Sequence, residues 1–187
     1  YCGRTWVCSR RLRRLHPSEH FQHEPSFQNA IVQSIGGGNT MVLNNAALRL
    51  VQESLSEVQE VASHDWWAYQ IVSGSGGHVV YDAKPMVLYR QHEENVIGAP
   101  TGLGAFLHRA FLVVSGTFQS WNDVNLRALE TSNVSLLEDN KRTVQMFQSA
   151  RSVSAMGRLR LLSKSGIHFQ TRMGNLGFWM AAVMKRI

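Results

Sequence analysis

The alternation of apolar and polar positions predicts that all strands lie in the first part of the chain. Residues 4–8 look like a strand already under way, and residues 78–81 and 86–89 are short apolar runs rich in Val, Leu and Tyr. Such runs favour β-strands. We expect residues 82–85, which contain a proline, to form a turn that joins two separate strands.

Helical spacing also occurs in this part of the chain. A short helix is expected over residues 27–35, and a longer one over 44–58, where apolar residues recur at helical intervals. Ser63 is a suitable N-cap for a third helix, in which residues 66–72 are nearly all apolar and therefore buried. The glycine-rich residues 73–77 end that helix. Between the first strand and the first helix we expect a basic connection and a polar, proline-punctuated loop, over residues 9–16 and 16–28.

Beyond residue 100 the pattern becomes helical throughout. Apolar residues keep helical spacing over residues 103–114, 121–131, 138–151, 153–164 and 173–187. We therefore expect an α/β part over residues 1–100 and a basic helical extension over residues 101–187.

Composition does not change the expected fold class, but it indicates the type of protein and the redox state of its compartment. The chain is 44% hydrophobic, which is ordinary for a globular protein, and 17% charged, which is on the low side. Cys2 and Cys8 are too few for a disulfide scaffold, so we interpret them as free thiols in a reducing compartment. The chain starts at Tyr1 without a methionine, and residues 4–8 begin as a strand, so we expect it to be truncated at its N-terminus.

Positive charge is concentrated towards the C-terminus. The formal net charge is +6, and no Asp or Glu follows Asp139. This asymmetry favours a polyanionic partner: an anionic membrane surface, phosphates or nucleic acid. The final stretch, residues 176–186, is apolar with a basic end and is too short to span a bilayer. It either lies in a membrane interface or docks on the protein core.

Residues 36–40, Gly-Gly-Gly-Asn-Thr, form the first element with candidate chemistry. Glycines permit a close approach of backbone to a ligand. A phosphate loop of the Walker type is excluded, because no Gly-Lys-Ser/Thr follows. The segment is either a tight turn into a strand or a loop that lines a sugar pocket with amide groups.

Residues 63–67, Ser-His-Asp-Trp-Trp, form the second element. Asp65 lies at the start of a helix, where the dipole favours a negative charge. It is either a capping carboxylate or a general base beside aromatic rings that suit a carbohydrate. Residues 89–92, Tyr-Arg-Gln-His, end a strand-like run, and we expect the two clusters to meet. Arg90 and His92 are suited to a diphosphate or a metal.

These segments together resemble a known family. The resemblance rests on residues 38–44, 63–67, 77–82, 88–92 and 95–99, in this order and spacing. They are similar to the C-terminal half of family-two glycosyltransferases, above all to the bacterial rhamnosyltransferase-like enzymes of cell-surface polysaccharide synthesis. The resemblance covers residues 1–100 well and the helical tail less specifically.

The resemblance implies an inverting transferase with a GT-A (Rossmann-like) fold. Its donor would be a nucleotide-diphosphate sugar and its acceptor a glycan or lipid-linked sugar. Asp65 would be the catalytic base, and a divalent metal, Mg²⁺ or Mn²⁺, would offset the charge on the departing diphosphate. His92 would face the metal and Arg90 the diphosphate.

The same resemblance assigns the remaining site residues to substrate binding. Gly38, Asn39 and Thr40 would line the donor-sugar or acceptor pocket. His64, Trp66 and Trp67 would support the site or contact the acceptor.

The chain departs from the family in one large respect, because it contains no Asp-x-Asp motif. We expect most metal ligands to belong to a missing N-terminal half, and the isolated chain to be inactive. The expected location is cytoplasmic, peripheral at the inner face of the membrane. The alternatives are a non-catalytic basic module that binds anionic membrane or nucleic acid, and an inactive structural remnant. Nucleic acid is the less favoured partner, because basic and aromatic residues do not alternate along the chain.

Overall fold

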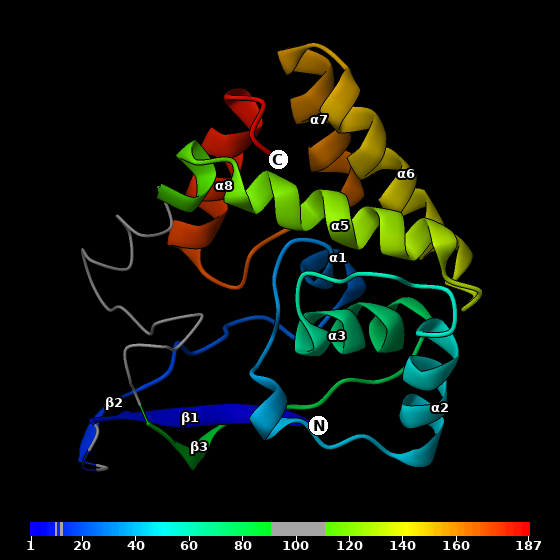
Figure 1. Cartoon of the computed structure of the whole chain (residues 1–187). Coiled ribbons are helices and arrows are strands. Elements are labelled where there is room, and N and C mark those ends of the chain that lie inside the picture. The colour runs from blue at the N-terminus through cyan, green and yellow to red at the C-terminus, as the bar shows by residue number, and fades with distance from the viewer. Residues whose placement is uncertain (10, 12, 91–110) are drawn as a thin grey trace.

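The computed structural model describes residues 1–9, 11, 13–90 and 111–187, and it shows a mixed α/β arrangement (Figure 1). A small three-stranded sheet lies at one side, and helices pack above it. The mixed α/β class expected from the sequence is confirmed.

The sheet has the order β2-β1-β3, with β1 (Cys2–Cys8) in the centre. Strand β2 (Arg14–Pro17) pairs with it antiparallel and β3 (Tyr81–Arg90) pairs with it parallel. The prediction that residues 9–16 form a connection without a strand is therefore wrong from residue 14 onward, where β2 begins. The chain reverses after β1 and uses these residues to cover one edge of the central strand.

The prediction of two strands joined by a turn at residues 82–85 is also wrong. Residues 81–90 form one strand, whose register against β1 shifts between Gly3 and Thr5. The shift places residues 83–86, which contain the proline, in a bulge. Proline is tolerated there because β3 is an edge strand and a bulged residue needs no ladder hydrogen bond.

Three helices and a 3₁₀ turn precede β3. Helix α1 (Phe27–Ala30) is shorter than predicted, and the turn η1 (Gly38–Thr40) follows it. Helix α2 (Asn45–Ser54) begins as expected, since the side chain of Asn44 accepts a hydrogen bond from the Ala47 N–H group. Helix α3 (His64–Gly74) is buried over most of its length, as its apolar sequence predicts.

The C-terminal part consists of helices α5 (Thr117–Thr131), α6 (Glu138–Ser152), α7 (Ala155–Ser165) and α8 (Arg172–Val183). The predicted helices over residues 121–131, 138–151, 153–164 and 173–187 are confirmed, with α5 starting earlier and α8 ending earlier. One apolar core joins α3, through Trp67 and Ile71, to α6 and α8, through Phe147 and Phe178. The predicted boundary at residue 100 lies outside the described residues and stays a prediction.

Cys2 and Cys8 are both free and buried. Among the described residues, no helix has the length and apolar character needed to cross a membrane.

Candidate active site

Asp65 lies in the first turn of α3 and faces residues 36–40, which we call the glycine loop. Its Oδ1 atom accepts hydrogen bonds from the Ser63 hydroxyl and, at 2.8 Å, from the Trp66 N–H group. Its Oδ2 atom accepts one from the Gly38 N–H group at 3.1 Å. The structure thus brings together residues that are 27 positions apart in the sequence. These donors fix the orientation of the carboxylate relative to the loop.

One oxygen of the Asp65 carboxylate can still accept a hydrogen bond. An ionised carboxylate has about four acceptor positions, two on each oxygen. Oδ1 uses both of its positions, whereas Oδ2 uses one, for Gly38. The side chain is also only partly buried. Asp65 therefore retains one acceptor position for a hydroxyl group from outside the protein.

Backbone hydrogen bonds hold the end of the glycine loop beside the N-terminal residue that precedes β1. The Tyr1 amino group donates to the Val42 carbonyl at 3.0 Å, and the Val42 N–H group donates to the Tyr1 carbonyl at 2.9 Å. The Thr40 hydroxyl donates to the Gly37 carbonyl at 2.8 Å. The loop is therefore a 3₁₀ turn that leads into an extended segment beside Tyr1, rather than a turn into a strand of the sheet.

The expected binding residues of this loop differ in their exposure. Asn39 is exposed, Gly38 is partly buried, and Thr40 is 8% exposed with its hydroxyl used inside the loop. The exposed His64 ring lies directly against Gly38, because a Cβ atom added to Gly38 would stand 2.3 Å from its Nε2 atom. Asn39 and His64 therefore offer polar groups to solvent beside Asp65.

Trp66 and Trp67 point into the core. Trp66 is 6% exposed and its indole N–H donates to the Ala30 carbonyl at 2.7 Å. Trp67 is 1% exposed and its indole N–H donates to the Ser54 hydroxyl at 2.9 Å. Buried rings with satisfied N–H groups present no face to an acceptor sugar. Of the two roles expected for them, only support of the α3 N-terminus fits this placement.

Arg90 lies far from Asp65. The glycine loop contacts the start of β1, since a Cβ atom on Gly36 would stand 3.4 Å from the Cys2 Cβ. Arg90 pairs with Cys8 at the other end of β1, six residues further along. At about 3.3 Å per residue the two ends of the strand are roughly 20 Å apart. The structure therefore does not bring the Arg90 backbone to Asp65, and His92 lies outside the described residues.

A metal does not fit the surroundings of Asp65. Its contacts are with hydrogen-bond donors, namely one hydroxyl and two backbone N–H groups, and a metal ligand set needs electron-pair donors. In the described part of the chain, no three His, Cys, Asp or Glu residues are grouped so that they would hold an ion.

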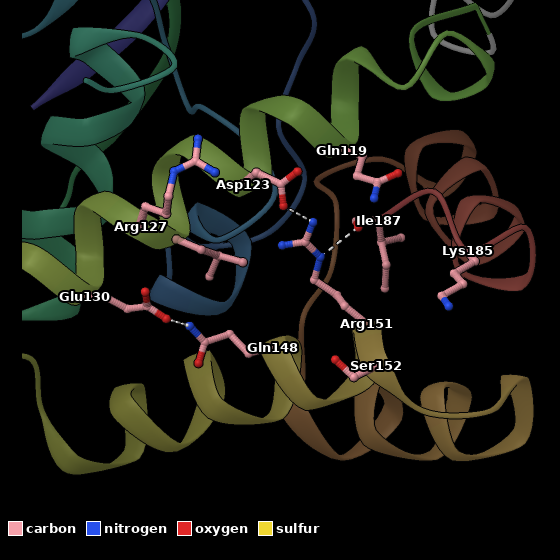
Figure 2. Close-up of a pocket in the computed structure, with 10 residues that line it drawn as sticks. Gln119, Asp123, Arg127, Glu130, Gln148, Arg151, Ser152, Lys185 and Ile187 are labelled. Atoms are coloured by element: carbon pink, nitrogen blue, oxygen red, sulfur yellow. Dashed lines mark hydrogen bonds and ion pairs between the residues drawn. The ribbon is translucent and has the colours of Figure 1, made fainter. Parts of the chain in front are cut away.

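A hollow lies away from Asp65, between α5, α6 and the residues after α8 (Figure 2). Its volume is about 580 Å³. Several of its polar groups pair with one another: Arg151 donates to Asp123 and to the Ile187 carbonyl, and Gln148 donates to Glu130. The lining comes from three separate segments, so no motif in the sequence indicated it. Trp66 contacts Trp121 of α5, with ring centroids 6.4 Å apart, so α5 separates this hollow from the Asp65 site.

Comparison with known proteins gives one relative. Over 85 residues the chain is 31% identical to the dTDP-rhamnosyl transferase RfbG of Shigella flexneri. The chain is related to a glycosyltransferase. The match covers 43% of this chain and 29% of the relative, so the chain spans less than a third of that protein's length. No family model and no solved structure matches the chain.

Proposed function

We propose that this chain is the acceptor-side part of an inverting glycosyltransferase with a GT-A fold. The reaction is transfer of a rhamnose-like sugar from a nucleotide-diphosphate donor to a glycan or lipid-linked acceptor, for cell-surface polysaccharide. A cytoplasmic location belongs to the same proposal. The relation to a dTDP-rhamnosyl transferase supports the reaction class. The observation that carries the proposal is the fixed Asp65 carboxylate with one unused acceptor position on Oδ2.

Asp65 acts as the general base in this proposal. Its Oδ2 atom accepts the proton of an acceptor hydroxyl while the hydroxyl oxygen attacks the anomeric carbon of the donor. The bond from that carbon to the diphosphate oxygen breaks, and the nucleoside diphosphate leaves with the electron pair. Gly38, Asn39 and His64 border the position of the acceptor, and the buried Trp66 and Trp67 hold the start of α3 in place. Thr40 keeps the loop in its turn.

The donor side of the reaction is assigned to residues outside this site. His92 remains a candidate for Mg²⁺ or Mn²⁺, whereas Arg90 lies at the far end of β1 and is given no role at the diphosphate of this donor. We derive no step through the metal, since the groups around Asp65 donate hydrogen bonds and do not coordinate. We infer that the isolated 187-residue chain does not transfer sugar without a donor-binding half.

The test is an Asp65→Asn exchange in a protein that includes the donor-binding half. Asparagine keeps the size of the side chain and removes the base, so transfer from dTDP-rhamnose is expected to fall by roughly 10²–10⁴-fold. Binding of the donor, measured by calorimetry, is expected to stay unchanged. The matched control is Asp82→Asn, because Asp82 is a partly buried carboxylate that bonds to the Tyr1 hydroxyl. Full transfer by the Asp65 variant would remove this residue as the base.

A further inference from the structure

Helix α8 has two apolar faces, and among the described residues only one of them packs on the rest of the protein. Gly174, Phe178, Ala181 and Ala182 are buried in the core. The opposite side carries large apolar side chains that are between 51% and 59% exposed: Met173, Leu176, Met180, Val183 and Met184. We call these five residues the outer face of α8.

The outer face is continuous along the helix. Its members are separated by three, four, three and one residues, which places them on one side of an α-helix. In the described part of the chain nothing covers its middle, because a Cβ atom added to Gly177 would meet no atom within 4 Å beyond its own neighbours and helix backbone. A contiguous exposed apolar surface of this kind marks a site of interaction.

Positive charge flanks the outer face at both ends. Arg172 precedes it, Lys185 and Arg186 follow it, and all three are exposed. No Asp or Glu occurs after Asp139, so no acidic residue of α7 or α8 offsets these cations. The occupant of this face must therefore be apolar opposite the methionines and negatively charged at its rim.

An anionic lipid surface has both properties in this geometry. The 12 residues of α8 extend about 18 Å, which is shorter than the roughly 30 Å of a bilayer's hydrocarbon core. The helix is therefore suited to lie along the surface, with its outer face among the acyl chains and its cations at the headgroups. A second copy that docked with its own α8 against this one would bring like charges together, since α7 and α8 contain no acid. Nucleic acid offers no apolar surface to the methionines.

We propose that α8 is an interfacial helix by which this protein binds membranes that contain anionic lipid. This inference is independent of the role of Asp65, and vesicle binding tests it without any transfer assay. It also accounts for the acid-free C-terminal sequence, which the proposed chemistry at Asp65 does not use.

The first experiment is co-sedimentation of the 187-residue chain with vesicles. We expect binding to mixed phosphatidylglycerol and phosphatidylcholine vesicles, weaker binding as ionic strength rises, and little binding to phosphatidylcholine alone. Met180→Ser with Met184→Ser is expected to weaken the partition coefficient at least about tenfold, since two apolar anchors are lost. The matched control is Met86→Ser with Met156→Ser, at positions 64% and 63% exposed on other elements, which should leave binding unchanged.

The second experiment tests the cations and the contact directly. Replacement of Arg172, Lys185 and Arg186 by Gln is expected to weaken binding about fivefold for each cation removed. A polarity-sensitive fluorophore on Gly177→Cys should shift to shorter wavelength when anionic vesicles are added, and this readout does not depend on how the serine variants fold.

Three results would overturn the proposal. The first is equal binding to neutral and anionic vesicles, and the second is fluorophore emission that does not shift when anionic vesicles are added. The third is a dimer that dissociates in the methionine variant, together with no binding of the chain to lipid.

Discussion

Arg158 offers the most direct test of how the C-terminal helices are held together. It is 3% exposed, and its guanidinium group donates to three backbone carbonyls rather than to a carboxylate. The Nε atom donates to Ala150 at 3.0 Å, Nη1 to Ala182 at 2.9 Å and Nη2 to Val153 at 2.9 Å. These carbonyls belong to the C-terminal ends of α6 and α8, where the helix dipoles favour a cation. The Ala182 carbonyl also accepts from the Lys185 N–H group at 3.2 Å.

Replacement of Arg158 by Met keeps the apolar stem and removes all three donors. Hydrogen bonds to a charged group contribute about 1.5–3 kcal/mol each, and their effects are not additive when they share one group. The buried carbonyls that remain lose a partner, so we expect the free energy of unfolding to fall by about 3–5 kcal/mol. For a protein of this size that corresponds to a decrease in Tm of roughly 10 °C.

The measurement is urea unfolding followed by circular dichroism, with the slope of the transition compared between variants. The control is Arg160→Met on the same helix, because Arg160 is exposed and its loss should change stability by only about 0.5 kcal/mol. Arg158→Lys should be intermediate, since one ammonium group cannot reproduce the planar fork of donors. A loss below about 1 kcal/mol for Arg158→Met, or equal losses at both arginines, would refute the capping argument.

Two further predictions concern the glycine loop and the buried thiol. Gly38→Ala should displace the exposed His64 ring with little change in Tm, because the new Cβ would stand 2.3 Å from the Nε2 atom at the flexible end of that side chain; a large fall in Tm that the second exchange His64→Ala does not restore would contradict this. Burial raises the pKa of the Cys2 thiol from 9.0 to about 11. The folded state therefore favours the protonated thiol, so its contribution to stability is complete below pH 9 and is lost as pH rises through about 11. Cys2→Ala should flatten the decline in unfolding free energy over this range, and an unchanged decline would contradict the assignment.

The helices of the C-terminal part were predictable because each one carries its own periodicity. The apolar spacing of α6 and α7 reflects which side of each helix is buried, and this information is local. The α3 sequence is likewise apolar enough to require burial wherever the helix packs. The unpaired outer face of α8 was visible as an apolar run, but its exposure was not.

Strand β3 shows where local information failed. Pro85 indicates a turn when its neighbours alone are considered. The position of β3 at an edge of the sheet, together with the bulge opposite Arg4, makes the proline compatible with one continuous strand. Edge position is a property of the assembled sheet and is not encoded in residues 82–85 themselves.

The sequence by itself determined that Asp65 stands at a helix N-terminus beside two indoles, because cap, carboxylate and apolar run are adjacent in the chain. Only the tertiary structure decided what surrounds it. Packing turned Trp66 and Trp67 into the core, brought the Gly38 N–H group to Oδ2, and left Arg90 at the far end of the sheet. The physical reason is that hydrogen-bond partners and burial depend on contacts between segments distant in sequence, whereas periodicity and capping depend on neighbours only.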